Sequence, residues 1–204
     1  MISYSFTKTK LDLSALLCYN RITKKEGAIT MRNDYKVRAK KFVEDFFPYM
    51  EDKMNSEKNY THQMSGMCEA VLAFNTVKHR RVMIDSGCSR TVLINSDYVV
   101  KIDRVNGAFC GNCEQEVYAY IFAKQEGFDY LFAEITPFKY KGITFYIMPR
   151  IRNIKEGRDD EELYCNLNDK EYVFITSHFN DLHGGNFGFK NGSPVIIDYA
   201  WNWV

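Results

Sequence analysis

The first clear pattern along the chain is helical. Between residues 34 and 53, apolar side chains alternate with charged ones at the spacing of an amphipathic helix. The apolar positions are Val37, Phe42, Val43, Phe46 and Phe47. We expect this face to pack on the rest of the domain, and we expect Pro48 to bend or end the helix. A second helix is predicted over residues 60–78.

After residue 79 the chain changes to short runs rich in β-branched and aromatic residues. Strands are predicted at residues 81–85, 91–94, 98–102, 132–140 and 143–149. The polar residues 95–97 predict a hairpin turn between the second and third strands, and Lys141-Gly142 joins the last two. A helix from about Asn112 to Gln125 separates the third strand from the fourth.

The last quarter of the chain begins with a polar stretch. Residues 152–170 carry a run of charges and predict a solvated linker with a short helix. A helix is predicted over residues 171–179. It is followed by a loop, a short strand, a turn at residues 191–194 and a strand at 195–197.

Composition excludes several classes of protein. A chain of 204 residues with 46% hydrophobic and 26% charged residues suits one globular domain with or without an extension, and not a disordered chain. The formal net charge of +1 gives no electrostatic footprint for nucleic acid and no polybasic membrane patch. No apolar run approaches the roughly 20 residues that cross a bilayer. Without a secretory signal, we expect the 6 cysteines to be reduced thiols in a cytoplasmic protein.

The chemistry is concentrated near the C-terminal end. Asp181 and Asn186 stand five residues apart in a glycine-rich loop, Asp181-Leu-His-Gly-Gly-Asn186, and Asp198 follows twelve residues later at the end of an apolar strand. Phosphoryl transfer from ATP uses this arrangement, because one aspartate accepts the proton of the acceptor hydroxyl and the other two side chains hold Mg²⁺. Hard oxygen ligands suit that ion.

This pattern resembles the protein-kinase-like fold, and especially its aminoglycoside- and choline-kinase-like branch, whose loop also has the form D-x-H-x-x-N. It is similar above all to small phage-type kinase-like proteins with loops of the form D-L-H-x-G-N-F-G and a strand ending in I-D-Y. The resemblance covers roughly residues 81–200. It implies ATP and Mg²⁺ as cofactors, Asp181 as catalytic base, and Asn186 and Asp198 as metal ligands.

The resemblance continues upstream in Ser86-Gly-Cys-Ser-Arg-Thr-Val92, which lies where kinases have their glycine-rich loop. Phage-type relatives have G-S-x-S-R-x-V here. The resemblance therefore implies that the nucleotide contacts Ser86, Gly87 and Cys88, with Val92 above the adenine. Backbone amides near Gly87 can approach phosphate closely because glycine lacks a Cβ.

Lys101 ends the run Tyr98-Val-Val-Lys101, which matches the V-A-I-K strand of kinases. A lysine on an apolar strand is costly to bury unless it is paired, and the implied partners are the α/β-phosphates and a helix glutamate. We favour Glu116, which is followed by valine and tyrosine as in phage-type relatives. Glu114 has the better apolar stripe behind it and remains the alternative.

The segment 146–151 lies at the position of the kinase hinge. Met148 is the expected gatekeeper, and residues 149 to Ile151 are expected to offer backbone groups to adenine. Cys110-Gly-Asn-Cys113 is a lone C-x-x-C, so we expect neither a zinc nor a redox site. His183 matches the family histidine, for which we expect a structural role, and His178 is expected to pack or cap.

Three features depart from the family pattern. No arginine precedes Asp181, so control by a phosphorylated activation loop is not expected. Gly188 stands where relatives place the apolar floor of the adenine pocket. Only six residues follow Asp198, which leaves no room for an activation loop or a peptide-binding platform, and we expect a strongly truncated C-lobe.

The expected fold is therefore α+β, a minimal protein-kinase-like fold with an antiparallel five-stranded N-lobe. We expect a helical extension over residues 1–80 that packs on the core, an N-lobe over 81–151 and the reduced C-lobe over 152–204. Met31 is an alternative start. The first hypothesis is a Ser/Thr kinase acting on a partner protein, a host protein in the host cytoplasm if the chain is phage-encoded. The alternatives are a pseudokinase that binds a protein, and a small-molecule kinase.

Overall fold

The computed structural model describes most of the chain beyond residue 33. The described residues are 34–56, 60–86, 90–103, 112–151, 164–179, 182 and 184–199. The described residues from Tyr35 onward belong to one compact unit. The expectations for Met31, Gly87, Cys88, Asp181 and His183 lie outside the described residues.

The five predicted strands form one antiparallel sheet in the order β1-β2-β3-β5-β4. They are β1 (Met83–Ser86), β2 (Arg90–Ile94), β3 (Tyr98–Asp103), β4 (Thr136–Tyr140) and β5 (Ile143–Pro149). Together with the helices this confirms the α+β class and the antiparallel five-stranded sheet.

Local turn chemistry explains the two tight hairpins of this sheet. The β2–β3 turn falls at residues 95–97 as predicted, where the Asn95 N–H donates to the Tyr98 carbonyl over 2.9 Å. The β4–β5 turn consists of Lys141 and Gly142, with φ of 45° and 86°. Two successive residues of positive φ match the right-handed twist of the strands they join, and glycine adopts that conformation without steric cost.

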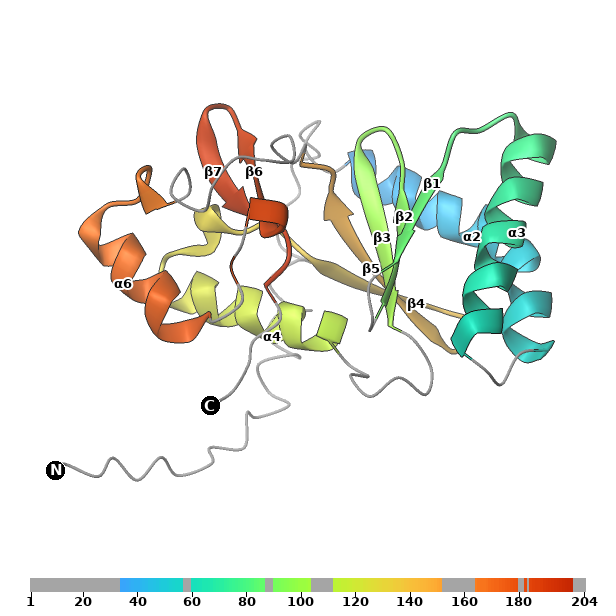
Figure 1. Ribbon diagram of the computed structural model, residues 1–204, viewed down its shortest axis with the longest axis horizontal. Helices are drawn as coiled ribbons and strands as arrows, with labels where there is room; N and C mark the ends of the chain where they lie inside the picture. The colour runs from blue at the N-terminus through green and yellow to red at the C-terminus, as the bar shows by residue number, and fades with distance from the viewer. Residues whose placement is uncertain are drawn as a thin grey trace, which may run out of the picture. The chain divides into compact units, whose positions relative to one another are not determined.

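Side chains alternate between the two faces of the sheet, and both faces are buried. On β5, Phe145 and Ile147 belong to one apolar cluster, whereas Tyr146 and Met148 belong to another. Figure 1 shows α2 and α3 side by side on one side of the sheet, with α4, α6 and the β6–β7 hairpin on the other. Because successive residues of a strand point to opposite faces, the central strands β3 and β5 contribute to both clusters.

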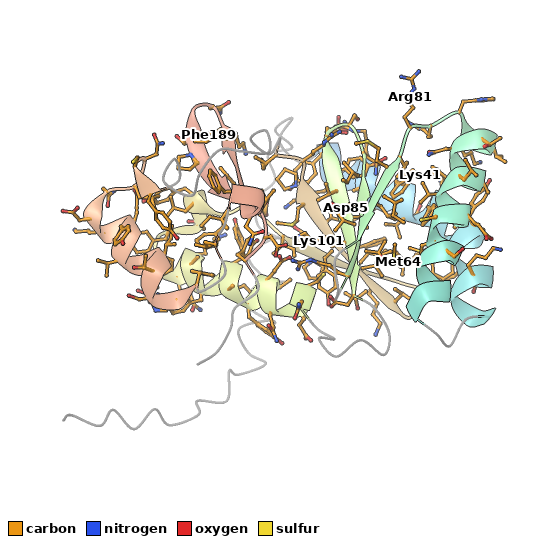
Figure 2. All side chains as sticks on the ribbon, viewed as in Figure 1. Lys41, Met64, Arg81, Asp85, Lys101 and Phe189 are labelled. Carbon is orange, nitrogen blue, oxygen red and sulfur yellow. The ribbon has the colours of Figure 1, made fainter. Side chains whose placement is uncertain are left out.

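The first face is covered by α2 (Asp34–Ser56) and α3 (Tyr60–Lys78), which meet through aromatic rings. Phe74 of α3 packs edge-on against Phe42 and Phe46 of α2, with ring centroids 5.4 and 5.5 Å apart. In Figure 2, Met64 lies on the α3 side of the sheet and Lys101 on the opposite side. The predicted packing of the first helix is therefore confirmed.

Two details of the predicted helix are different in the structure. The helix does not end at Pro48 but continues to Ser56. Pro48 is exposed, as is Glu44 one turn earlier, so the carbonyl that proline leaves without an N–H donor faces water. Val37 was placed on the buried face but is 65% exposed, and Ala39 and Met50 complete the buried stripe instead.

The second face carries the remaining elements. They are α4 (Asn112–Gln125), the 3₁₀ turn η2 (Asp129–Leu131), α6 (Asp169–His178), the 3₁₀ turn η3 (Gly184–Asn186), β6 (Phe187–Lys190) and β7 (Ser193–Ile196). The β6–β7 hairpin forms a separate two-stranded sheet. Within the described part of the chain, no helix is long and apolar enough to cross a membrane.

The strand predicted at residues 132–140 begins later, at Thr136. Phe132 instead forms an isolated parallel bridge with Ile196, and the Ala133 N–H donates to the Ile196 carbonyl over 2.8 Å. The apolar residues Leu131, Phe132, Ala133 and Ile135 are buried because they pack in the cluster beside β7, not because they lie in the main sheet. This bridge places β7 beside the segment that leads into β4.

Candidate functional site

The centre of the candidate site is the ammonium group of Lys101, on the second face of the sheet, the one that α4 covers. Its Nζ lies 2.9 and 2.8 Å from the two carboxylate oxygens of Glu116. It also donates to the backbone carbonyl of Ile197 over 2.9 Å. Lys101 is 5% exposed, and these contacts supply the pairing that a buried ammonium requires.

Glu116 reaches Lys101 from the inward face of α4. It is fully buried, whereas Glu114 is exposed and accepts a hydrogen bond from Tyr118 of the same helix. Two residues along a helix change direction by about 200°, so only one of the two glutamates can face the sheet. The structure pairs Lys101 with Glu116 and not with Glu114.

The segment that follows β7 brings Asp198 to the same place. The backbone carbonyl of Asn186 accepts the N–H groups of Ile197 and Asp198, over 2.7 and 3.3 Å. Tyr199 anchors the other end, because its buried hydroxyl donates to the Ala133 carbonyl over 2.6 Å. The two residues predicted as metal ligands, Asn186 and Asp198, are thus held as neighbours by their backbones.

Arg90 completes the cluster from β2. Its Nη1 donates to Glu116 Oε1 over 3.1 Å, and its Nη2 pairs with Asp198 Oδ1. Its side chain is 9% exposed and that of Asp198 is 39% exposed. One guanidinium therefore bridges the buried helix glutamate and the more open loop aspartate. Two cations and two carboxylates form a cluster with balanced charge.

The charges in this cluster shift the pKa values of its acids in different directions. Complete burial raises the pKa of Glu116, and the attraction of Lys101 and Arg90 acts against that shift. Burial also opposes ionisation of Asp198, but the charges of Lys101 and Arg90 and the hydrogen bond from Arg90 outweigh it and lower its pKa. Besides Lys101 and Arg90, the Tyr199 N–H donates a hydrogen bond to Glu116 over 3.3 Å.

An apolar surface lies beside the charged cluster. Met148 is 1% exposed and pairs across β3–β5 with Val99. Val92, half-buried, is the cross-strand partner of Lys101. Ile151 is also half-buried and packs on the same cluster as Met148. These three residues, predicted to contact the nucleotide, thus belong to the face of the sheet that carries Lys101.

Three other residues near the site contribute through their backbones. The backbone of Ser86 ends β1, where it pairs with Thr91 of β2. Gly188 is buried in β6 opposite Val195 and adds no side chain to an adenine floor. Ile197, which is half-buried, lies within hydrogen-bond distance of Lys101 through its backbone.

The donor set at Asn186 and Asp198 fits a hard cation. It offers one amide and one carboxylate side chain, both with oxygen donors, which suit a Mg²⁺ ion that keeps several waters and binds substrate phosphates. Among the described residues, no group of three or more histidine, cysteine, aspartate or glutamate side chains is arranged to hold a metal.

The competing candidates lie outside the cluster. Cys113 is a buried free thiol whose pKa is raised, first by burial and then by the nearby acids Glu116 and Asp103. A buried thiol that resists ionisation suits neither a redox nor a metal site. His178 bonds the Phe174 carbonyl over 2.8 Å and packs on aromatic rings, which agrees with the packing or capping role expected for it.

Arg90 is the residue that sequence reasoning missed. Arg90 lies within the Ser86–Val92 motif, but no role was predicted for it. The available signal was strand alternation, because residue 90 lies on the same face as Val92, which pairs with Lys101. A cation two residues from Val92 on a buried face needs an acidic partner.

Comparison with known proteins adds no relative. No protein-family model matches the sequence, and no curated protein and no solved structure matches it significantly. The function must therefore be argued from the geometry of the site.

Proposed function

We propose that this chain is an ATP- and Mg²⁺-dependent phosphotransferase with a minimal protein-kinase-like fold and a reduced C-lobe. We further propose that it phosphorylates Ser or Thr hydroxyls of a partner protein. The observation that carries the proposal is the position of Lys101, whose ammonium is held between Glu116 of α4 and the backbone next to Asp198. Kinases require both a strand lysine paired with a helix glutamate and a nearby metal-binding aspartate.

Each residue of the cluster has a role in this proposal. Lys101 would bind the α/β-phosphates, and Glu116 would hold Lys101 in position. Asn186 and Asp198 would hold the metal, which, when bound, neutralises the charge that develops on the transferred phosphoryl group. Positioning of the phosphates by fixed charges supplies most of the catalysis in such sites.

The apolar surface next to the cluster would take the adenine. Val92 and Met148 would line it, and the chain from residue 149 to Ile151 would offer backbone groups to the base. The segment 86–88, which connects β1 to β2 in the sequence, would cover the phosphates. Asp181, by its resemblance to the family loop, would accept the proton of the acceptor hydroxyl as its oxygen attacks the γ-phosphorus and the bond to ADP breaks.

The direct test is transfer of ³²P from labelled ATP to protein in a host lysate. The proposal predicts label on protein with the wild-type chain and none with Asp181→Asn. Glu44→Gln, an exposed change on α2, serves as a matched carboxylate control and should keep activity. Label in the low-mass fraction alone would indicate a small-molecule kinase, and no label in either fraction would contradict the proposed activity.

One observation favours a second candidate, a protein-binding module without transfer activity. The exposed carboxylate of the site, Asp198, is already engaged by Arg90. If that pair never opens, the metal lacks its carboxylate ligand and the cluster is only structural. This candidate predicts a stable complex in a pull-down that survives Asp181→Asn, together with no change in melting temperature on adding ATP and Mg²⁺.

A further inference from the structure

Arg90 is an unusual neighbour for a metal-binding aspartate. Its guanidinium contacts Asp198 directly, at the carboxylate oxygen Oδ1. The second arm holds Glu116, which is inaccessible to solvent. Of the two carboxylates in the cluster, only Asp198 is exposed enough to accept a ligand from outside.

The charge balance of the cluster follows from these contacts. Lys101 and Arg90 offset Glu116 and Asp198, so a divalent cation that enters alone creates an excess of positive charge. It must also displace Arg90 from Asp198 and leave a nearly buried guanidinium with one partner fewer, which is costly. A nucleotide changes this balance, because its phosphates bring negative charge and offer new acceptors to the released guanidinium.

Resting on the proposed function, we propose that Arg90 is a built-in counter-ion of Asp198 that excludes divalent cations until a nucleotide is bound. Metal and ATP then bind together, and Arg90 moves from the carboxylate to the phosphates. Lys101 also attracts Asp198, but its ammonium hydrogen-bonds Glu116 and the Ile197 carbonyl, whereas Arg90 contacts the Asp198 carboxylate directly. The planar fork of Arg90 contacts two carboxylates through separate nitrogens, Nη1 to Glu116 and Nη2 to Asp198.

The test measures Mn²⁺ binding in the absence of nucleotide, by electron paramagnetic resonance of the free ion. Arg90→Met should bind Mn²⁺ at least about tenfold more tightly than wild type, since it removes one unit charge at contact distance from the ion. Arg81→Met makes the same change in net charge at an exposed position before β1 (Figure 2) and should behave as wild type. Arg90→Met combined with Asp198→Asn should lose the gain, which assigns the ion to Asp198.

A second variant and a second readout keep the test decisive. Arg90→Gln removes the charge but keeps hydrogen-bonding capacity, and it replaces Arg90→Met if thermal melting shows that the methionine variant does not fold. Equal Mn²⁺ affinity in wild type and in the folded Arg90 variant would overturn the counter-ion role. The nucleotide site is tested separately by the melting temperature of wild type with ATP and Mn²⁺ together. A gain in Mn²⁺ affinity without any ATP response would leave the counter-ion standing and contradict the proposed function.

Discussion

Replacing Glu116 by glutamine is the sharpest test of whether the charged cluster is a mutually dependent network that joins the sheet to α4. Both carboxylate oxygens of Glu116 accept hydrogen bonds, from Lys101, from Arg90 and from the Tyr199 N–H. Glutamine has nearly the same shape as glutamate but no charge. Its NH₂ group would replace one carboxylate oxygen and would face the N–H donors that this oxygen now accepts. Two nearly buried cations would then share only Asp198.

Breaking a buried ion pair from one side costs about 3–5 kcal/mol, because the remaining charge is left uncompensated. For a domain of this size, that corresponds to a fall in melting temperature of roughly 6–20 °C. Urea unfolding followed by circular dichroism measures the free energy of unfolding directly. Adding Lys101→Met to Glu116→Gln removes one of the unpaired cations, so the double variant should be less destabilised than the two single changes predict when summed.

Glu114→Gln is the matched control, because it makes the same chemical change two residues away on the exposed face of α4. It should alter the free energy of unfolding by less than about 0.5 kcal/mol. A Glu116→Gln protein that is destabilised no more than Glu114→Gln would refute the claim that the cluster is a buried, mutually dependent ion-pair network.

Three further predictions concern the apolar core, a buried hydrogen bond and a surface ion pair. Phe46→Ala should lower the free energy of unfolding by about 3–5 kcal/mol in urea titrations, because it empties a fully buried position in the α2–α3–sheet cluster, whereas exposed Val37→Ala should change it little. Tyr199→Phe should cost about 1–2 kcal/mol, since a buried backbone carbonyl loses its hydrogen bond; an unchanged melting curve would contradict this. Burial opposes ionisation of Asp97, but hydrogen bonds from Arg38 and a neighbouring serine lower its pKa. The stability that the Arg38–Asp97 pair gives is therefore present above the ordinary carboxyl pKa of about 3.9 and is lost as the pH falls through the lower folded value, so the stability difference between wild type and Asp97→Asn should shrink in acid.

The secondary structure was largely predictable because local signals and tertiary packing agree. The polar turn at residues 95–97 and the glycine at 142 fix two hairpins through backbone chemistry alone. The phenylalanine stripe of α2 likewise specifies a buried face. Tertiary context decided two departures from the predictions. The helix does not end at Pro48, whose side faces water, and residues 132–135 do not join the main sheet but meet β7.

The site was predictable only in part, for a different reason. The spacing of Lys101 and Glu116 in the sequence carries no information on their distance in space, and the pair depended on the resemblance to kinases. Arg90 was missed because a motif assigns roles to positions without counting charge. A buried cluster with one lysine and two carboxylates is unbalanced, and that imbalance is the physical signal that a second cation is required.

The measurement that tests the central claim most directly is the melting temperature with ATP, with and without Mg²⁺, for wild type and for Asp198→Asn. Ligand at about 100 times its dissociation constant adds roughly 2.7 kcal/mol to the free energy of unfolding, a shift of about 5–10 °C for a domain of this size. The account predicts a shift that depends on Mg²⁺ in wild type and disappears in Asp198→Asn. No shift in either protein at millimolar ATP would contradict a nucleotide site built on Lys101 and Asp198.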